Sequence, residues 1–494
     1  MEENTSQTAT NELSPGLLSL PMEILLLIIE MAASRGSGAA ALLELMLVCR
    51  AFVAPASLLL HKSLRLRKKA QAEGLLESLK RAPSPARLAS STKSLSISYR
   101  SDSNVVEGEV STTTALPILF LLDNLRYLDV DAGDEGLKAV RQVLASGGGG
   151  MSKLRGLKSS KVRWDKLVGM LANTHKLARL DIEGLHQAEP AGEDAEQDDE
   201  DAPPTEAGSS SPPATTTHLG DDEEEGVLLF RPELARPPSP SLPAPLVLPP
   251  FPASPLTRLV LRSPNIADEL LLSILSASYK TLSSLALIEA HCFSRTALVV
   301  ALKGVRNLSD LELSACRFPP GDDAQFAPAV AARPANSPPN ALTPLPSLVL
   351  SPTDPPFRLS TPLPAPFSSD TARLTPSELA FPLDHLPRLL PFLHVLTLSS
   401  DDLLSADPAG RGGDALASVV GALPLQYLTL DIARPRIGVD ELVEAVKRAE
   451  GRIDAVAVGK RMRWTQRMLD EGKTACAEMG VLLGGDVVEE RLRW

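Results

Sequence analysis

The sequence predicts an α/β fold in which short strands and helices alternate as repeated units. In the pattern Leu-x-x-Leu-x-Leu the second and third leucines are two residues apart, so their side chains share one face of a short strand. Helical spacing follows the first copy, where Ile266, Leu270 and Ile274 recur at four-residue steps. One unit cannot bury its leucine face alone, so the units are expected to stack. Three copies start 26 residues apart, at Leu256, Leu282 and Leu308.

Further copies of the pattern extend the series toward both ends of the chain. Two weaker copies bracket it at residues 92–97 and 453–458. Four good copies begin at Leu125, Leu177, Leu393 and Leu425. The pattern and its period resemble the leucine-rich repeat, whose units run to roughly 20–29 residues, and this resemblance implies a solenoid of strand–helix units. The alternative is a generic α/β domain whose strands happen to be rich in leucine.

The segments between the strands predict crossing helices. We expect helices over residues 266–279 and 294–305, and again over 414–423 and 439–449. A longer charged helix is expected over 461–479. The polar end of the chain suits the terminal cap that a repeat array needs.

The turns after the strands are expected to be irregular. Cys316 follows the Leu308 copy at the position where repeat families place Asn or Cys to close the turn. The equivalent positions of other copies hold Pro264, Ala290 and Ala433 instead.

Two long insertions interrupt the repeats. Residues 188–255 are acidic and rich in proline, and residues 319–380 are rich in Pro, Ala and Ser. The spans 190–255 and 319–391 hold 33 of the 43 prolines of the chain. Such sequence fills neither a helix nor a sheet ladder and has little to bury, so both insertions are expected to be disordered loops at the surface. The repeats then comprise residues 67–187, 256–318 and 381–494, the last with a helical cap.

The N-terminal region predicts a small helical domain. Residues 1–14 are polar and are expected to be a disordered tail, followed by a helical domain over 15–66. Residues 20–25 read Leu-Pro-Met-Glu-Ile-Leu, residues 47–52 read Leu-Val-Cys-Arg-Ala-Phe, and a Leu-x-x-x-Leu-x-Leu string ends at Leu66. These motifs resemble, in order, those of the F-box, a three-helix domain. The resemblance covers about one tenth of the chain, and the spacer between the first two motifs is long for the family.

The F-box resemblance implies a partner. Such domains dock on the Skp-type adaptor of a cullin ubiquitin ligase, which here means helix-in-groove recognition through an apolar surface. The alternative is a helical cap that only covers the end of the repeat array. Carried over by motif, the expected adaptor contacts are Leu20, Pro21, Ile24, Leu25, Ile28, Leu47, Val48 and Cys49.

Composition narrows the function further. The net charge of −12 argues against a nucleic-acid-binding surface as the main purpose. Four scattered cysteines predict reduced thiols in the cytoplasm, the nucleus or both. No signal peptide is expected, and residues 17–33 are too short and too interrupted for a membrane span. The sequence contains no Gly-x-Ser-x-Gly, P-loop, dinucleotide fingerprint or His-Glu-x-x-His motif. We therefore expect that the protein is not an enzyme and has no cofactor and no metal site.

What remains is a protein-binding surface. The residues between the inward leucines of each strand face the concave side, where charged and tyrosine side chains suit protein recognition; the alternative is an ordinary solvated strand face. The prediction is a substrate-recognition subunit of a Skp-cullin-F-box ligase, with an interaction scaffold outside any ligase as the alternative. The expected target contacts are Tyr127, Asp129, Arg179, Asp181, Arg258, Arg262, Asp310, Glu312, Tyr427 and Asp431.

Overall fold

The protein is described by a computed structural model. The described residues are 21–34, 38–48, 50–81, 89–98, 110, 112–131, 140–144, 153–187, 246–318, 357–359, 363, 367 and 374–485. The expected N-terminal tail, the centres of both insertions and residues 487–494 lie outside these ranges.

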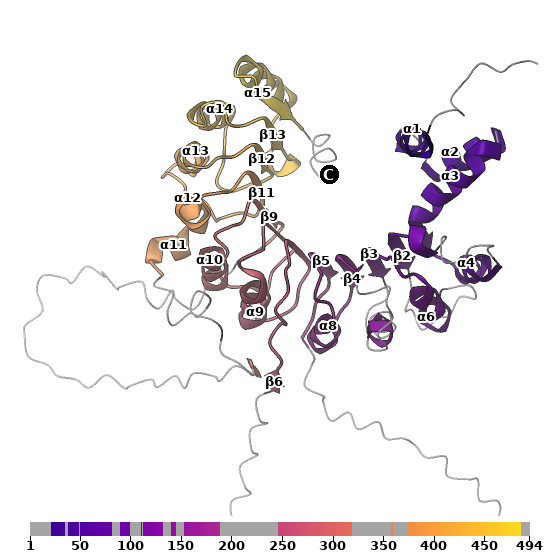
Figure 1. The fold of residues 1–494 in the computed structure, drawn as a ribbon. Coiled ribbons are helices and arrows are strands. Elements are labelled where there is room, and N and C mark those ends of the chain that lie inside the picture. Colours follow the sequence, from indigo (N-terminus) through magenta and orange to yellow (C-terminus); the bar gives the residue numbers. More distant parts are fainter. Residues whose placement is uncertain are drawn as a thin grey trace, which may run out of the picture.

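A single parallel sheet organises the chain from residue 63 onward. Figure 1 shows it curved into an arc, with helices on the outer side and strands on the inner side. Twelve strands pair in chain order, interrupted only where β6 and β10 belong elsewhere. They are β1 (Ser63–Leu66), β2 (Ser94–Ser98), β3 (Tyr127–Asp131), β4 (Gly156–Ser160), β5 (Arg179–Glu183), β7 (Arg258–Arg262), β8 (Ser284–Ile288), β9 (Asp310–Ser314), β11 (Val395–Ser399), β12 (Tyr427–Leu430), β13 (Ala455–Val458) and β14 (Leu482–Gly484). We call this part, residues 63–485, the repeat body.

The register of the sheet follows the leucine pattern. Leu180 pairs with Leu259, which pairs with Leu285, and the same alignment continues along the sheet. The next aligned row runs through Ile182, Leu261 and Leu287, and all three side chains are fully buried. Because the side-chain period of a strand is two, this register sends every patterned leucine into one core.

The helices lie where the sequence places them. Residues 268–278 form α9 and 295–304 form α10, inside the expected spans. Toward the C-terminus, α15 starts later than expected, because a short 3-10 helix precedes it. The helices of the repeat body are α4 (Lys69–Arg81), α6 (Thr112–Leu121), α8 (Trp164–Leu171), α9 (Asp268–Ser278), α10 (Arg295–Gly304), α11 (Pro376–Ala380), α12 (Leu386–Leu389), α13 (Gly413–Ala422), α14 (Val439–Arg448) and α15 (Gln466–Glu478), with 3-10 turns η5 (Pro382–His385) and η6 (Lys460–Met462).

The turns that follow five strands are regular in backbone conformation although their residues vary. Ser263, Glu289 and Ala315 come directly after their strands and have φ between 43° and 54°. The N–H of each donates to a carbonyl at the end of the next strand, at 2.7–3.2 Å. Lys161 and Gly184 repeat the arrangement. The irregularity expected from the side chains therefore does not extend to the backbone.

The sheet continues across the positions of both insertions. β5 pairs directly with β7, and β9 pairs directly with β11. The strands on either side of each insertion are therefore neighbours in space, and the register is kept across both gaps.

The ends of both insertions are folded, which corrects the expectation of disorder up to residues 255 and 380. β6 (Leu246–Leu248) and β10 (Phe357–Leu359) form a parallel two-stranded sheet that joins one insertion to the other. Next to β6, Pro249 accepts a hydrogen bond from the Trp164 indole N–H at 3.1 Å, and Phe251 is 5% exposed. Apolar side chains embedded in the proline-rich sequence thus have a core to enter.

Phe367 anchors the second insertion in the same way. Its side chain is fully buried, and its ring lies 6.0 Å from that of Tyr279. It packs so closely on α10 that a Cβ at Gly304 would stand 2.2 Å from the ring. After this anchor the chain enters α11.

The N-terminal helices form a separate small unit, which we call the three-helix unit. It consists of α1 (Met22–Ser34), α2 (Gly38–Val48) and α3 (Arg50–Lys62), and α3 leads directly into β1. Leu25, Ile29, Leu42 and Ala56 form its buried core, and partly buried side chains such as Phe52 and Leu59 pack against them. The ammonium of Lys62 binds the carboxylate of Glu30, which ties the end of α3 to α1.

Candidate functional site

The three-helix unit exposes an unusual amount of apolar side chain. On α1, Leu25 and Ile29 enter the core, while Ile24, Ile28 and Met31 on another face are exposed. Helices that are apolar all round are ordinarily buried on all sides. Exposed apolar surface of this kind marks a site of interaction. The exposed apolar residues of the unit are Ile24, Leu27, Ile28, Met31, Leu43, Leu47, Val48 and Val53.

The expected adaptor contacts divide into three groups. Pro21, Ile24, Ile28, Leu47 and Val48 are exposed, and Leu47 and Val48 most of all, at 88% and 75%. Leu25 is 5% exposed, so its expected role as an adaptor contact is corrected. It packs inside the unit because its position on α1 faces the other two helices. Leu20 and the side chain of Cys49 lie outside the described part of the chain.

The concave face of the sheet carries the expected target contacts in aligned rows. Tyr127, Arg179 and Arg258 belong to one row, with Gly156 between the first two. The next outward row holds Asp129, Lys158 and Asp181. Residues of β2 to β7 line a shallow depression of about 220 Å³ here.

Gly156 creates the centre of this depression. A Cβ on Gly156 would lie 2.6 Å from Cδ1 of Tyr127, so the ring occupies the space that a side chain would fill. Across the glycine, the guanidinium of Arg179 lies 5.7 Å from the Tyr127 ring centroid, a cation–π contact. Tyr127 and Arg179 remain exposed in this arrangement. The pair therefore presents a preformed aromatic and cationic surface.

Neighbouring charges are held by hydrogen bonds. Nε of Arg262 donates to Asp181 at 3.3 Å, and Ser96 donates to Asp129 at 3.2 Å. Asp181 and Asp129 are half-buried, whereas Arg258 is exposed. The depression thus combines fixed carboxylates with exposed arginines, which suits a partner that has both charges on its surface.

The remaining expected contacts lie elsewhere on the sheet. Asp310 and Glu312 are half-buried on β9, and Tyr427 is half-buried on β12. The strand between them carries the neutral Val395 and Thr397 in the same rows. These three residues are therefore not part of the charged depression on β2 to β7.

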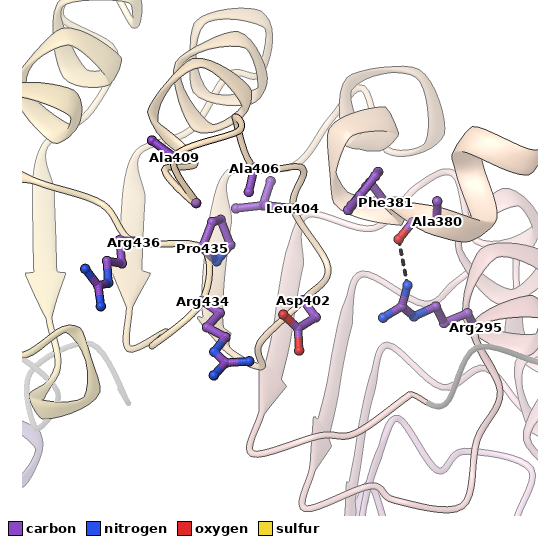
Figure 2. Close-up of a pocket in the computed structure, with 11 residues that line it drawn as sticks. Arg295, Ala380, Phe381, Asp402, Leu404, Ala406, Ala409, Arg434, Pro435 and Arg436 are labelled. Carbon is purple, nitrogen blue, oxygen red and sulfur yellow. Dashed lines mark hydrogen bonds between the residues drawn. The ribbon is translucent and has the colours of Figure 1, made fainter.

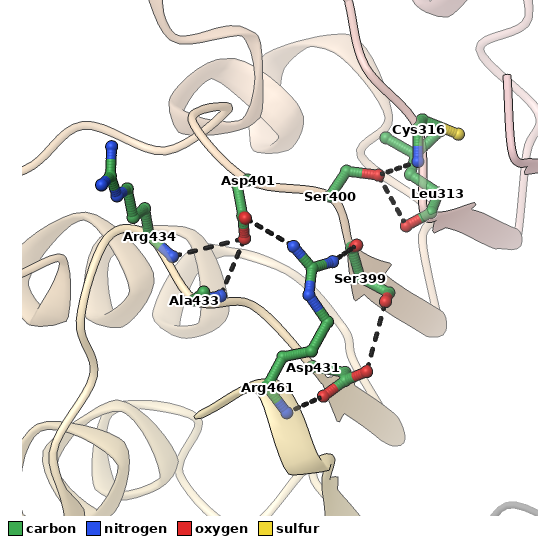
Figure 3. Close-up of polar contacts among 9 residues, drawn as sticks. All are labelled: Leu313, Cys316, Ser399, Ser400, Asp401, Asp431, Ala433, Arg434 and Arg461. Atoms are coloured by element: carbon green, nitrogen blue, oxygen red, sulfur yellow. Dashed lines mark hydrogen bonds and ion pairs between the residues drawn. The ribbon is translucent and has the colours of Figure 1, made fainter. Parts of the chain in front are cut away.

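Asp431 serves to join turns rather than to face a ligand. Its carboxylate accepts the backbone N–H of Arg461 at 2.7 Å and the hydroxyl of Ser399 at 3.4 Å. The Arg461 guanidinium binds the Ser399 carbonyl and Asp401 in turn (Figure 3). In the same view the Ser400 hydroxyl donates to the Leu313 carbonyl and accepts the backbone N–H of Cys316, each at 3.1 Å.

Sequence reasoning missed several residues that line the depression, among them Ser94, Gly156, Lys158 and Val260. Gly156 and Lys158 lie on β4, whose pattern breaks off at Ser159, where other copies have an apolar residue. The signal that remained was Leu154 and Leu157 at the correct spacing. Both are buried, like the equivalent leucines of the other strands.

The described residues contain no cluster of His, Cys, Asp or Glu that would hold a metal ion. Nor, over the same ranges, does any helix combine the length and apolar character needed to cross a membrane. Neither a scan against protein-family models nor a search of curated proteins found a match for this chain.

Proposed function

We propose that the protein is the substrate-recognition subunit of a Skp-cullin-F-box ubiquitin ligase. In this proposal the three-helix unit is an F-box that docks on a Skp-type adaptor, and through it on a cullin. The repeat body is a leucine-rich-repeat solenoid whose concave face holds a target protein. The chain performs no chemistry itself, and it works in the cytoplasm, the nucleus or both.

The observation that carries the proposal is the exposed apolar surface of α1 and α2. A unit whose only task was to cover the end of the sheet would expose polar side chains to water. Here Leu43, Leu47 and Val48 are exposed instead. At roughly 25 cal/mol per Å² of apolar surface removed from water, their burial under a partner would favour association. The order of the Leu-Pro-x-Glu-Ile-Leu and Leu-Val-Cys-Arg-x-Phe motifs favours an adaptor as that partner.

The concave depression supports the target-binding half of the proposal. The Tyr127 and Arg179 pair is exposed and preformed, and aromatic and arginine side chains dominate binding energy at protein interfaces. Arg258 extends the same surface onto β7. A target with a mixed-charge surface would satisfy these groups.

The test is binding of the full chain to purified Skp adaptor. The variant Leu47→Asp with Val48→Asp places two charges on the exposed apolar surface. We expect its adaptor affinity to fall at least about a hundredfold, because buried unpaired charges are costly. The matched control is Leu482→Asp with Phe392→Asp, two exposed apolar residues outside the three-helix unit. The control should bind like the unaltered chain.

The alternative is a protein-interaction scaffold with no ligase role. It predicts no adaptor binding by the unaltered chain, while the concave face still binds a partner. If the Leu47→Asp, Val48→Asp variant bound the adaptor as tightly as the unaltered chain, the proposed docking surface would be wrong. Circular dichroism of each variant establishes that a loss of binding is not a loss of folding.

A further inference from the structure

A second polar groove lies beside the C-terminal ends of strands β11 and β12, away from both surfaces described above. It has a volume of about 600 Å³ and is formed by the start of α10, the end of α11 and the loops after β11 and β12 (Figure 2). Leu404 and Pro435 are buried and give it an apolar floor, while Phe381 on its rim is 39% exposed. Three arginines, Arg295, Arg434 and Arg436, line the groove against a single carboxylate, that of Asp402.

The arginines of the groove differ in what they already bind. Arg295 donates to the carbonyls of Ala380, at 2.7 Å, and Phe318, at 3.2 Å, so it is held in place. The guanidinium groups of Arg434 and Arg436 are exposed and make no hydrogen bond or ion pair with any residue that the structure describes. By contrast, nearby Arg411 is paired with Asp407 at 3.1 Å.

The backbone that carries the two unpaired arginines is fixed. Asp401 accepts the N–H of Ala433 at 2.7 Å and that of Arg434 at 3.3 Å, and the network of Figure 3 holds this carboxylate in turn. The Arg436 carbonyl accepts from Gly412 at 2.9 Å. Gly412 also packs on Pro435 so closely that a Cβ would lie 2.2 Å from its ring. The groove is therefore preorganised before any ligand arrives.

We infer that this groove binds an acidic peptide segment of a partner protein. Guanidinium groups pair carboxylates through two parallel hydrogen bonds, and two unpaired guanidinium groups leave room for two carboxylates. The apolar floor and the exposed Phe381 ring would go unused by a small inorganic anion, but they fit an apolar side chain between the acidic ones. The chain as a whole carries a net charge of −12, so attraction of an acidic ligand must come from this local cluster.

The groove is separate from the adaptor-facing helices and from the concave depression, so its test does not depend on theirs. The probe is a fluorescently labelled peptide of alternating Glu and Leu, and the control is the same peptide with Gln in place of Glu. Fluorescence anisotropy measures both against the full chain at low and high salt. We expect the Glu peptide alone to bind, and more weakly as salt screens the charges.

Two double variants locate the site. Arg434→Gln with Arg436→Gln should weaken binding of the Glu peptide roughly tenfold or more, because charge-assisted hydrogen bonds are lost. Arg448→Gln with Arg467→Gln removes the same charge from exposed positions on α14 and α15 and should leave binding unchanged. Equal loss in both variants, or equal binding of the Gln peptide, would overturn the inference.

The chain itself contains an acidic stretch, which is the alternative ligand for this groove. A variant lacking residues 190–225, which include that stretch, therefore joins the comparison. Equal affinity of the Glu peptide for this variant and for the full chain supports a partner protein as the source of the ligand. Binding that is seen only after the deletion would overturn that assignment and give the groove to the chain's own segment.

Discussion

The three-helix unit and the repeat body use apolar side chains in opposite ways. In the repeat body one continuous core runs from Leu66 to Val481, and the leucines of the pattern are buried in it. Among the described residues of the three-helix unit, four buried apolar side chains form a small core, whereas Leu47 is 88% exposed. The repeat body thus buries the leucines of its pattern in its own core, whereas the three-helix unit leaves several apolar side chains exposed.

The charged surfaces, in contrast, lie on the repeat body. The concave depression on β2 to β7 is rich in charge, and the groove at Arg434 and Arg436 has unpaired cations. The two regions therefore differ in what they expose: the three-helix unit exposes apolar side chains, and the repeat body exposes charged and polar ones. Substitutions in each region should separate stability from binding, and the following three are ordered by the size of their effect on stability.

Phe251→Ala should have the largest effect. The ring is buried against Trp164, 6.0 Å away between centroids, and its loss leaves a cavity in the convex layer of the repeat body. Removing a buried aromatic ring costs roughly 3–5 kcal/mol. Urea unfolding of the full chain measures this cost. The control is deletion of residues 190–240, which stops short of β6 and should leave the transition in place; a fall as large as that of Phe251→Ala would contradict the boundary drawn here.

Lys303→Met should have an intermediate effect, on the order of 3 kcal/mol, because it removes a partner from a buried carboxylate. The Glu378 side chain is fully buried and lies 3.1 Å from the Lys303 ammonium. Burial acts to raise the pKa of the Glu378 carboxyl, but the Thr375 backbone N–H and Lys303 outweigh it and hold this pKa below its usual value.

The pH dependence supplies the check on this variant. A carboxyl with a lowered pKa in the folded state stabilises the fold at higher pH, and that contribution is lost as pH falls through its pKa. The difference between Lys303→Met and the unaltered chain should therefore shrink in acid. Lys473→Met, on the exposed face of α15, is the control and should cost little at any pH. A difference that stayed constant down to acid pH would mean that Lys303 stabilises by packing alone.

Leu47→Ser should have the smallest effect on stability, within about 0.5 kcal/mol, because the side chain is already in water. Thermal unfolding of the full chain measures it, with Ile29→Ser in the core of the same unit as the comparison. Ile29 is 2% exposed, so its substitution should destabilise the three-helix unit. A large loss of stability on Leu47→Ser would break the contrast between the two regions, since the residue would then be part of a core.

Much of the repeat body could be predicted because its signal is local. The leucine pattern specifies both the strand and the face that it buries, and each copy was assigned to the correct strand. β4 was missed because Ser159 replaces an apolar residue of the pattern. The anchors Phe251 and Phe367 were missed because a single aromatic residue in a proline-rich segment gives no periodic signal.

The candidate binding surfaces were only partly predictable. Alternation along each strand identified the concave row through Tyr127 and Arg179, but it included Asp431, whose carboxylate is bonded to neighbouring turns. The groove could not be predicted, since Arg295 begins α10 whereas Asp402 and Arg434 lie in the loops after β11 and β12. Only the tertiary fold brings such residues together. The exposure of Leu47 was likewise invisible in a pattern that leaves open which of two apolar helix faces is buried.

The pairing of β6 with β10 has a consequence for the covalent chain. Residues 319–356 separate β9 from β10 in the sequence, and the chain after them is held at β10, at Phe367 and at β11. A single peptide-bond cut inside that stretch would leave two fragments that still share the β9–β11 ladder, the β6–β10 pair and one core. The protein is thus suited to reconstitution from two separately expressed halves, with the new termini in an insertion that the sheet does not need.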